Sequence, residues 1–253
     1  MKRLPHFSII ICSYNNEKWC VENVESCLRQ NYPNFTIYYI DDCSQDKTAD
    51  LIDALVRKRG LQDKVKLIHN KKRKGSLANL YEVINRLPPD DIVCLVDGDD
   101  LLPHVDVLAT VAQYYRDKTI WMTYGNYRTW PFDFNVSGKK FPKAVIEKSG
   151  FRSFPWVAGA LRTFYAKLFQ LIKKRDLTWK RGQFFPMSGD LAYTFPMLEM
   201  CTKNHFAFID ETLYLYNLEN PLNDWKLNIE LQNEIETYIR KKKPYKCIKR
   251  LLS

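Results

Sequence analysis

The first half of the chain alternates between short apolar runs and segments with helical periodicity. The apolar runs are rich in β-branched and aromatic residues and have the length of buried strands; they span residues 7–12, 36–40, 65–68, 92–96 and 120–124. Between these runs, apolar residues recur every three or four positions, which gives two helical faces: Leu51, Ile52, Leu55 and Val56, and Leu77, Leu80, Tyr81, Ile84 and Leu87. Ser44 or Asp46 is expected to cap the first of these helices. Strands that alternate with helices predict an α/β fold with a mainly parallel sheet flanked by helices.

The pattern is looser after residue 126. Residues 126–160 are rich in Pro, Gly and aromatic residues and predict long loops with short strands. Four later segments are more regular and predict an amphipathic helix at 161–174, a helix at 190–201, a final pair of strands at 205–217 and a last helix at 225–242. Pro196 is expected to bend or interrupt the second of these segments. Because no repeat, low-complexity linker or clear boundary appears, we expect a single domain over residues 1–253.

Polar clusters follow three of the predicted strands. Residues 13–16, which include Ser13, Tyr14 and Asn16, follow the first strand; Asp41 and Asp42 follow the second, and residues 97–100 follow the fourth. In parallel α/β sheets, ligands bind at the carboxyl ends of the strands. Three clusters that converge on one sheet edge predict a binding site there.

The third cluster lies in the sequence CLVDGDDLLPH at residues 94–104. Its three aspartates repel one another at neutral pH, so a positive group is expected among them. Asp97 and Asp99 point the same way in an extended segment, and their hard oxygen ligands suit Mg²⁺ or Mn²⁺. Gly98 lets a diphosphate approach the backbone. The alternative is an acidic cap for the next helix, and Asp100 is expected either to cap that helix or to support the other two aspartates.

A nucleotide would have to be bound without a glycine-rich phosphate loop, because neither GxGxxG nor GxxxxGK[ST] occurs among the nine glycines. A divalent cation held by carboxylates is the substitute. Asp41 or Asp42 could accept a hydrogen bond from the base or the ribose, while Ser13 and Tyr14 could bond to the base or stack on it. Lys74 and Arg73 could meet the diphosphate. The alternatives are a packing role for the tyrosine and a solvated basic turn for the two cations.

The charge balance favours an anionic partner. Lysine and arginine outnumber aspartate and glutamate by 39 to 29, a net charge of +10. Much of this charge lies at residues 71–74 and in the C-terminal sequence RKKKPYKCIKR at 240–250. The excess could serve nucleic acid, anionic lipid or a phosphorylated small molecule, although such runs are usually solvated surface. No nucleic-acid recognition motif is present, so we expect no nucleic-acid partner.

The cysteines and the hydropathy pattern indicate the cellular compartment of the protein. The seven cysteines form no CxxC pair and no zinc-type spacing, which indicates a reducing compartment. No run approaches 18 apolar residues and no signal-peptide pattern opens the chain. We therefore expect a cytoplasmic protein, with peripheral membrane contact through the basic C-terminus left open.

Four motifs in order resemble the family 2 glycosyltransferases, which have the GT-A fold: IIICSYNN, IDDCSQDKT, NKKRKGSLANLYEVI and LVDGDDLLP. The resemblance continues through WMTYGNYR, FRSFPWVAGALRTFYAKLF and DLAYTFPMLEM to LYLYNLENPLND, so it covers nearly the whole chain. The later segments are similar to a subgroup found in bacteria and large DNA viruses.

This resemblance implies an inverting, metal-dependent enzyme that moves a sugar from a nucleotide-diphosphate sugar, with a UDP-sugar favoured, to a hydroxyl acceptor. The acceptor could be a glycan, a lipid-linked sugar or a protein hydroxyl. Asp42, with Asp41, and Tyr14 would surround the base, and Asp97 and Asp99 would meet the ribose and the metal. Residues 1–125 would form the nucleotide-sugar half of a GT-A domain, and residues 126–253 an acceptor-side half with a C-terminal helical elaboration.

The resemblance also implies a catalytic carboxylate at Asp190, in SGDLAYTFPMLEM. A sugar hydroxyl is a poor nucleophile, so a carboxylate within hydrogen-bond reach must take its proton. Asp190 follows a flexible Ser-Gly turn and precedes an apolar helical stretch, so the alternative is a plain helix cap. Glu199 is the second candidate. Many relatives carry an aromatic residue or Glu where this chain has Gly189.

Other residues are weaker candidates. Arg152 and Arg162 could act as cations near the donor or acceptor. Five aromatic residues are candidate platforms on which an acceptor sugar could stack: Trp130, Phe132, Phe134, Trp156 and Trp179. The subgroup carries a polar pair where this chain has Gly159 and Ala160, a change that bears on acceptor choice or on the strength of catalysis.

Two other readings of the same motifs are open. A nucleotidyltransferase shares the nucleotide, the metal and the paired aspartates, but it should carry a glycine-rich loop where this chain has SYNNEKW. A catalytically inactive nucleotide-sugar-binding GT-A module would keep the same motifs and differ only in turnover.

Overall fold

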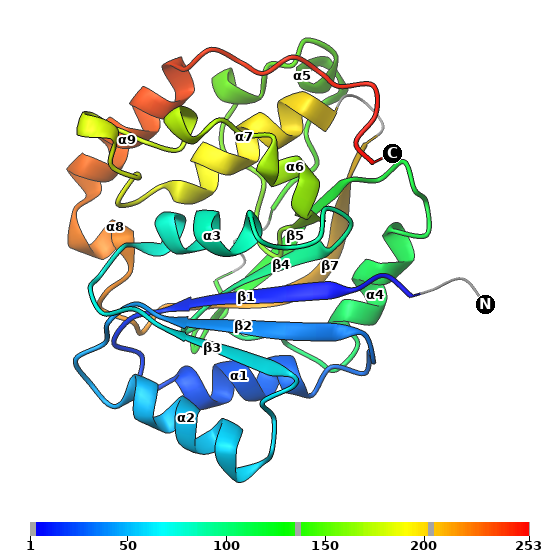
Figure 1. The fold of residues 1–253 in the computed structure, drawn as a ribbon. Coiled ribbons are helices and arrows are strands. Elements are labelled where there is room, and N and C mark those ends of the chain that lie inside the picture. Colours follow the sequence, from blue (N-terminus) through cyan, green and yellow to red (C-terminus); the bar gives the residue numbers. More distant parts are fainter. Residues whose placement is uncertain (1–3, 135–137, 202–204, 253) are drawn as a thin grey trace.

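A computed structural model describes residues 4–134, 138–201 and 205–252. Its sheet has seven strands in the order β3-β2-β1-β4-β6-β5-β7 (Figure 1). The strands are β1 (Phe7–Ser13), β2 (Phe35–Asp41), β3 (Val65–His69), β4 (Ile92–Asp97), β5 (Met122–Trp130), β6 (Thr163–Tyr165) and β7 (Phe206–Asn217). Strand β1 pairs in parallel with β2 and β4, β2 with β3, and β5 with β7, whereas β6 is antiparallel to both of its neighbours. The predicted α/β fold with a mainly parallel sheet is confirmed.

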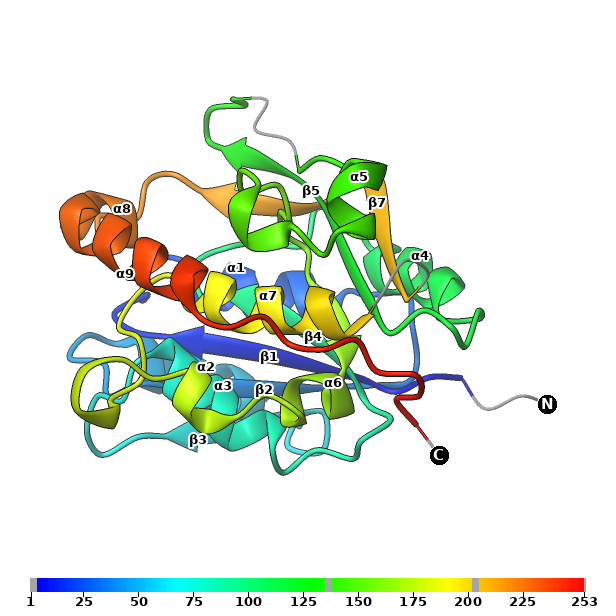
Figure 2. The ribbon, with the colours of Figure 1, turned by 90° about the horizontal axis from the view of Figure 1, so that it is seen from above.

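Helices cover both faces of the sheet. On one face lie α1 (Cys20–Leu28) and α2 (Thr48–Lys58); on the other lie α3 (Ser76–Ile84), α6 (Ala166–Gln170) and α7 (Gly189–Cys201) (Figure 1). The remaining helices are α4 (Val107–Tyr114), α5 (Lys143–Glu147), α8 (Asp224–Leu227) and α9 (Ile229–Lys241), with 3₁₀ turns at Phe151–Ser153, Lys174–Asp176 and Lys180–Gly182. Figure 2 shows α9 beside α7 and the C-terminal tail running on past α6.

The core explains why the apolar runs are strands. Ile9 and Ile11 on β1 and Cys94 on β4 are fully buried because layers of helix cover both sides of these central strands. At the start of α2, the backbone N–H of Thr48 donates to the Asp46 carboxylate over 2.9 Å. Asp46 is therefore the side chain that satisfies this helix terminus. Ser44, the other candidate, instead accepts from the backbone N–H of Asn15.

Two predicted elements of the second half are wrong. Residues 161–174 do not form one helix, because Thr163–Tyr165 fills the gap between β4 and β5 as a strand and only Ala166–Gln170 is helical. The predicted pair of strands at 205–217 is one long strand, Phe206–Asn217. Its pairing with β5 shifts register near Gly125 and Asn126, and this irregularity interrupts the sequence pattern in the middle of the strand.

The remaining helices differ in detail. Helix α7 continues through Pro196. The predicted last helix is divided at Asn228, whose backbone is extended (φ −160°, ψ 85°) and whose side chain accepts from the N–H of Leu231 and so begins α9. Strand β5 starts at Met122 and runs to Trp130, six residues beyond the predicted end. Within the described residues, none of the helices combines the length and apolar character needed to cross a membrane.

Candidate active site

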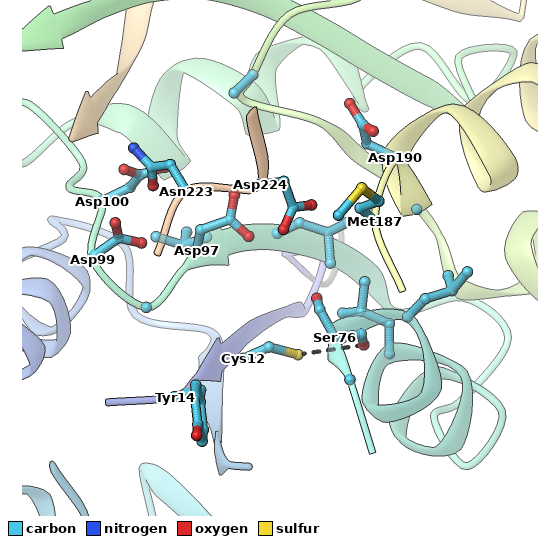
Figure 3. Close-up of a pocket in the computed structure, with 18 of the residues that line it drawn as sticks. Cys12, Tyr14, Ser76, Asp97, Asp99, Asp100, Met187, Asp190, Asn223 and Asp224 are labelled. Carbon is cyan, nitrogen blue, oxygen red and sulfur yellow. Dashed lines mark hydrogen bonds between the residues drawn. The ribbon is translucent and has the colours of Figure 1, made fainter. Parts of the chain in front are cut away.

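A pocket of about 530 Å³ lies at the carboxyl ends of β1 and β4, the sheet edge that the polar clusters predict. Strand ends form its floor, the start of α3 and residues 185–190 form one side, and the end of β7 with α8 forms the other. Figure 3 shows that carboxylates from three of these segments line it: Asp97 and Asp99 after β4, Asp190 on α7 and Asp224 on α8.

The turn after β4 requires a glycine because it packs directly on the end of β1. A Cβ atom at Gly98 would lie 2.7 Å from Asn16 Nδ2 and 2.8 Å from Ser13 Oγ. The Asn16 amide in turn donates to Ser13 Oγ over 3.0 Å. Ser13 and Asn16 line the pocket and are buried. Because both side chains pack against Gly98, they hold the Asp97–Asp99 turn in place.

Asp97 and Asp99 both line the pocket, but their surroundings differ. Asp99 is 8% exposed, and its Oδ2 accepts from the amide of Asn220 over 2.7 Å. Burial raises the pKa of Asp99 to about 6, against the opposing effect of the Asn220 hydrogen bond. The Asp97 side chain faces the open pocket. Surrounding protein atoms still desolvate it and raise its pKa, an effect that the positive charge of Arg162 opposes.

Asp100 supports this turn and does not cap the next helix. Helix α4 begins only at Val107, whereas Asp100 Oδ1 accepts from the backbone N–H of Asn217 over 2.7 Å. Its carboxylate thus attaches the end of β7 to the Asp97–Asp99 turn. Burial, together with the charges of Asp99 and Asp97, raises its pKa well above the ordinary value.

The donor set suits a divalent cation. Among the described residues, no group of three or more His, Cys, Asp or Glu side chains is arranged to hold a metal. Magnesium, however, is usually bound by one or two carboxylates together with the phosphates of the substrate. Asp97 and Asp99 offer two carboxylates, and their raised pKa values show that each lacks full compensation for its charge. A cation beside them would supply that compensation, so these residues fit Mg²⁺ or Mn²⁺.

The opposite wall of the pocket carries Tyr14, Asp42 and Arg73. The Arg73 guanidinium lies 3.8 Å from the centre of the Tyr14 ring. Asp42 accepts from the backbone N–H groups of Lys74 (3.0 Å) and Gly75 (2.8 Å) and from the amide of Asn70 (2.8 Å). Burial alone would raise the pKa of Asp42, but its several hydrogen bonds prevail and lower it. Asp42 therefore stays ionised and holds the 70–75 loop beside the pocket.

Two of the predicted donor residues lie elsewhere. Asp41 is buried behind the pocket and accepts from the backbone N–H of Ser44 over 3.2 Å. The Lys74 ammonium pairs with Glu82 over 2.7 Å on the surface of α3. Neither belongs to the residues that line the described pocket, and Arg73 is the cation of this loop that does.

Asp190 lies in the first turn of α7, and its carboxylate is 3.5 Å from Nη1 of Arg162. Arg162 also lines the pocket, and its charge acts on Asp97 as well. Glycine is favoured before Asp190, because a Cβ at Gly189 would lie 3.3 Å from the Leu77 side chain, which would have to shift. This contact between α7 and α3 is a packing reason for glycine at position 189, where many relatives carry an aromatic residue or Glu. At Gly159, a Cβ would lie 2.8 Å from the Gly125 carbonyl oxygen.

Glu199, the second candidate for the base, does not belong to the residues that line the described pocket. It is 2% exposed and forms a two-point ion pair with Arg152, at 2.5 and 3.0 Å. Arg152 also donates to the backbone carbonyl of Ile239. The pair therefore joins α7 to α9, which accounts for both residues.

Sequence reasoning missed the part of the site that α8 contributes. Asn220, Asp224 and Trp225 line the pocket. Burial, with the negative charges of Asp97 and Asp190, raises the pKa of Asp224 to about 6. The segment LYLYNLENPLND belongs to the family resemblance, but its polar end NPLND reads as an ordinary loop and gave no site residue. Of the five aromatic candidates, Trp156 lines the pocket, whereas Phe132 and Phe134 are exposed on the loop that follows β5.

Comparisons with known proteins identify the family and the fold. The family described as "Glycosyl transferase family 2" matches residues 8–170. The glycosyltransferase GlyG of Streptococcus pneumoniae is 27% identical over 221 residues, which cover 83% of this chain and 69% of GlyG.

Two solved structures share the fold. Residues 1–349 of Staphylococcus aureus TarS in complex with UDP-GlcNAc superpose with a TM-score of 0.60 at 17% identity, over 85% of this chain and 59% of that one. The mannosyltransferase PcManGT of Pyrobaculum calidifontis, in complex with GDP-Man and Mn²⁺, gives a TM-score of 0.61 at 18% identity, over 96% and 67%. The chain thus spans well under two thirds of the TarS structure. Because the family match covers more than half of its 253 residues, this chain belongs to glycosyl transferase family 2.

Proposed function

We propose that the protein is an inverting glycosyltransferase that moves a sugar from a nucleotide-diphosphate sugar, with a UDP-sugar favoured, to a hydroxyl acceptor. The observation that carries the proposal is the convergence of Asp97, Asp99 and Asp190 on one pocket at the sheet edge (Figure 3). The UDP-GlcNAc and GDP-Man complexes of the two structural neighbours support a nucleotide-sugar donor.

The donor half of the proposal rests on residues 1–125. Tyr14 and Arg73 flank the nucleotide end of the pocket, and Asp42 fixes the loop that presents Arg73. Asp97 and Asp99 would hold Mn²⁺ or Mg²⁺, which when bound neutralises charge on the diphosphate. The Mn²⁺ in the PcManGT complex supports this choice of metal. Residues 126–253 supply Arg162, Asp190 and α8, and we assign them to the acceptor.

The proposed chemistry is a single displacement. Asp190 accepts the proton of the acceptor hydroxyl as its oxygen attacks the anomeric carbon, and the bond from that carbon to the diphosphate breaks. Attack and departure occur on opposite faces of the sugar, so the configuration inverts. Arg162, 3.5 Å from Asp190, orients this carboxylate.

The nucleotidyltransferase reading is less favoured, because the end of β1 carries Asn16, hydrogen-bonded to Thr48 and Ser13, where a glycine-rich loop would be expected. A catalytically inactive binding module would keep the pocket without turnover. Release of nucleotide diphosphate separates this alternative from an active enzyme.

The proposal also includes a cytoplasmic location and peripheral contact with a membrane. Exposed basic residues of the C-terminal tail supply positive charge that anionic lipid attracts: Lys241, Lys243, Lys246, Lys249 and Arg250. Sedimentation with vesicles that contain anionic phospholipid tests this part; equal recovery with neutral vesicles would contradict it.

Thermal-shift screening against UDP-, GDP- and other nucleotide sugars, with and without Mn²⁺, tests the central proposal. At least one donor should raise the unfolding temperature, more strongly with Mn²⁺, and should be hydrolysed slowly to the nucleotide diphosphate. If no nucleotide sugar shifts the melting curve in either condition, the proposed function is wrong.

A further inference from the structure

The acceptor side of the pocket carries a row of aromatic side chains that begins on α8. We call the residues Tyr127, Trp156, Tyr216 and Trp225 the aromatic wall. They come from β5, from the segment before β6, from β7 and from α8, and all four line the pocket. Because these segments are far apart in the sequence, it is the fold that brings the aromatic wall together.

Trp225 is 47% exposed at the pocket, and the Lys226 ammonium lies 5.2 Å from the centre of its ring. The Tyr216 ring packs edge-on against Tyr127, with ring centres 6.1 Å apart and an angle of 67° between the planes. A half-exposed tryptophan gains only part of the hydrophobic stabilisation that a buried one provides. The position of Trp225 at the pocket is therefore better explained by a ligand than by packing.

The aromatic wall leads to the proposed base. Tyr127 lines the same pocket as Arg162 and Asp190. On the other side of the pocket, Arg73 covers Tyr14. A ligand that lies along the aromatic wall would reach Asp190 from the side opposite Tyr14.

Polar groups border the aromatic wall. Asp224, the residue before Trp225, lines the pocket. Gln232 on α9 also lines the pocket, and its amide oxygen has no hydrogen-bond partner among the described residues. Both groups accept hydrogen bonds, so the matching ligand has an apolar face and hydroxyl donors around its rim. An alkyl chain would cover these acceptors without pairing them, which is unfavourable.

We propose that the acceptor group bound in this pocket is a pyranose ring, whose C–H face stacks on Trp225 and whose hydroxyls donate to Asp224 and Gln232. This inference rests on the proposed function and deepens it, because it selects a sugar among the possible acceptors. A pyranose combines the apolar face that aromatic rings bind with hydroxyl groups at its edge. One further hydroxyl of the same ring then meets Asp190.

The test compares Trp225→Ala and Trp225→Phe with Phe132→Ala, an exposed aromatic residue outside the pocket. Acceptor probes are the methyl β-glycopyranosides of glucose, galactose and N-acetylglucosamine, with octanol and a serine peptide as alternatives. The donor is the nucleotide sugar that binds in the thermal-shift screen. Thermal unfolding of each variant checks that the fold is intact.

At least one glycoside should accept the sugar. Trp225→Ala should raise the KM for that glycoside about tenfold, the equivalent of ~1.4 kcal/mol, and should change the KM for the donor much less. Trp225→Phe should retain most of the affinity, and Phe132→Ala should match the wild type. An unchanged acceptor KM in Trp225→Ala, or transfer only to octanol or to the peptide, would overturn the inference. If the wild type acts on no nucleotide sugar at all, the proposed function itself fails.

Discussion

The guanidinium of Arg162 lies 3.5 Å from the carboxylate of Asp190, and its charge also acts on Asp97. One buried cation therefore serves two carboxylates from separate elements, β4 and α7. Its own position is fixed by a hydrogen bond to the carbonyl oxygen of Ala158 over 3.2 Å. Replacement of Arg162 by Met should leave Asp97 and Asp190 without this shared partner.

We expect Arg162→Met to lower kcat by about 10- to 100-fold, because misplacement of a catalytic group by ~1 Å has an effect of this size. The affinity for the donor should change less. Arg162→Lys should keep part of the activity. Arg128→Met, which removes an exposed arginine that pairs with Asp133, is the matched control. Steady-state kinetics with the donor and acceptor varied separately measure the effect, and equal losses in kcat for the Arg162 and Arg128 variants would refute this role.

Asp190→Asn tests the base directly. A carboxamide cannot take the proton of the acceptor hydroxyl, so transfer should fall by about 10²- to 10⁴-fold. Binding of the nucleotide sugar, followed by calorimetry, should persist because Asp190 lies on the acceptor side. Glu230→Gln, at an exposed acid in the first turn of α9, should behave like the wild type. If Asp190→Asn keeps more than about a tenth of the activity, the base is another residue, and Asp224 in the same pocket is next to be tested.

Local sequence patterns determine some elements of this fold, whereas others depend on contacts between distant residues. The strands and the polar clusters after β1, β2 and β4 could be predicted, because they depend on periodicity and on the rule for parallel sheets. Strand β6 could not, because Thr163–Tyr165 is a strand only through pairing with β4 and β5. Asp224 and Trp225 reach the pocket because Asn220 binds Asp99 across 121 positions of sequence, which no local pattern reveals.

The same reasoning explains the errors at single residues. Asp41 and Asp42 are neighbours at the end of β2, yet only Asp42 lines the pocket. Alternation along a strand indicates that the two side chains diverge, but not which of them meets a ligand. Arg73 and Lys74 present the same ambiguity, which the structure resolves through the pair between Lys74 and Glu82.

Asp42→Asn should weaken the protein in a pH-dependent way. The pKa of Asp42 is lower in the folded protein than its ordinary value, because its hydrogen bonds outweigh the effect of burial. Its ionised form therefore stabilises the fold above about pH 4, and this contribution is lost as the pH falls through the folded pKa below that value. We expect the variant to lose on the order of 1–3 kcal/mol at pH 7 and the difference from the wild type to shrink toward pH 3.

Urea unfolding at pH 7 and pH 3 measures this effect, with Asp63→Asn as a control at an exposed position. The 70–75 loop should also become more mobile, so the affinity for the donor should fall. A loss of stability that is equal at both pH values would show that the charge of Asp42 is not its cause.

Gly98→Ala should distort the site through steric overlap alone. The added Cβ would lie 2.7 Å from Asn16 Nδ2 and 2.8 Å from Ser13 Cβ and Oγ, all three on buried side chains at the end of β1. Relief of this overlap must move the Asp97–Asp99 turn away from β1, at a cost of about 1–3 kcal/mol in unfolding free energy. Because Asp97 and Asp99 are the proposed metal ligands, stabilisation by Mn²⁺ with the donor should fall as well.

Gly150→Ala is the matched control, since its nearest neighbour beyond the adjacent residues is a carbonyl oxygen at 3.8 Å. Thermal unfolding with and without Mn²⁺ and donor compares the two variants, and a Gly98→Ala protein with wild-type stability and donor response would show that the turn can yield without moving its carboxylates.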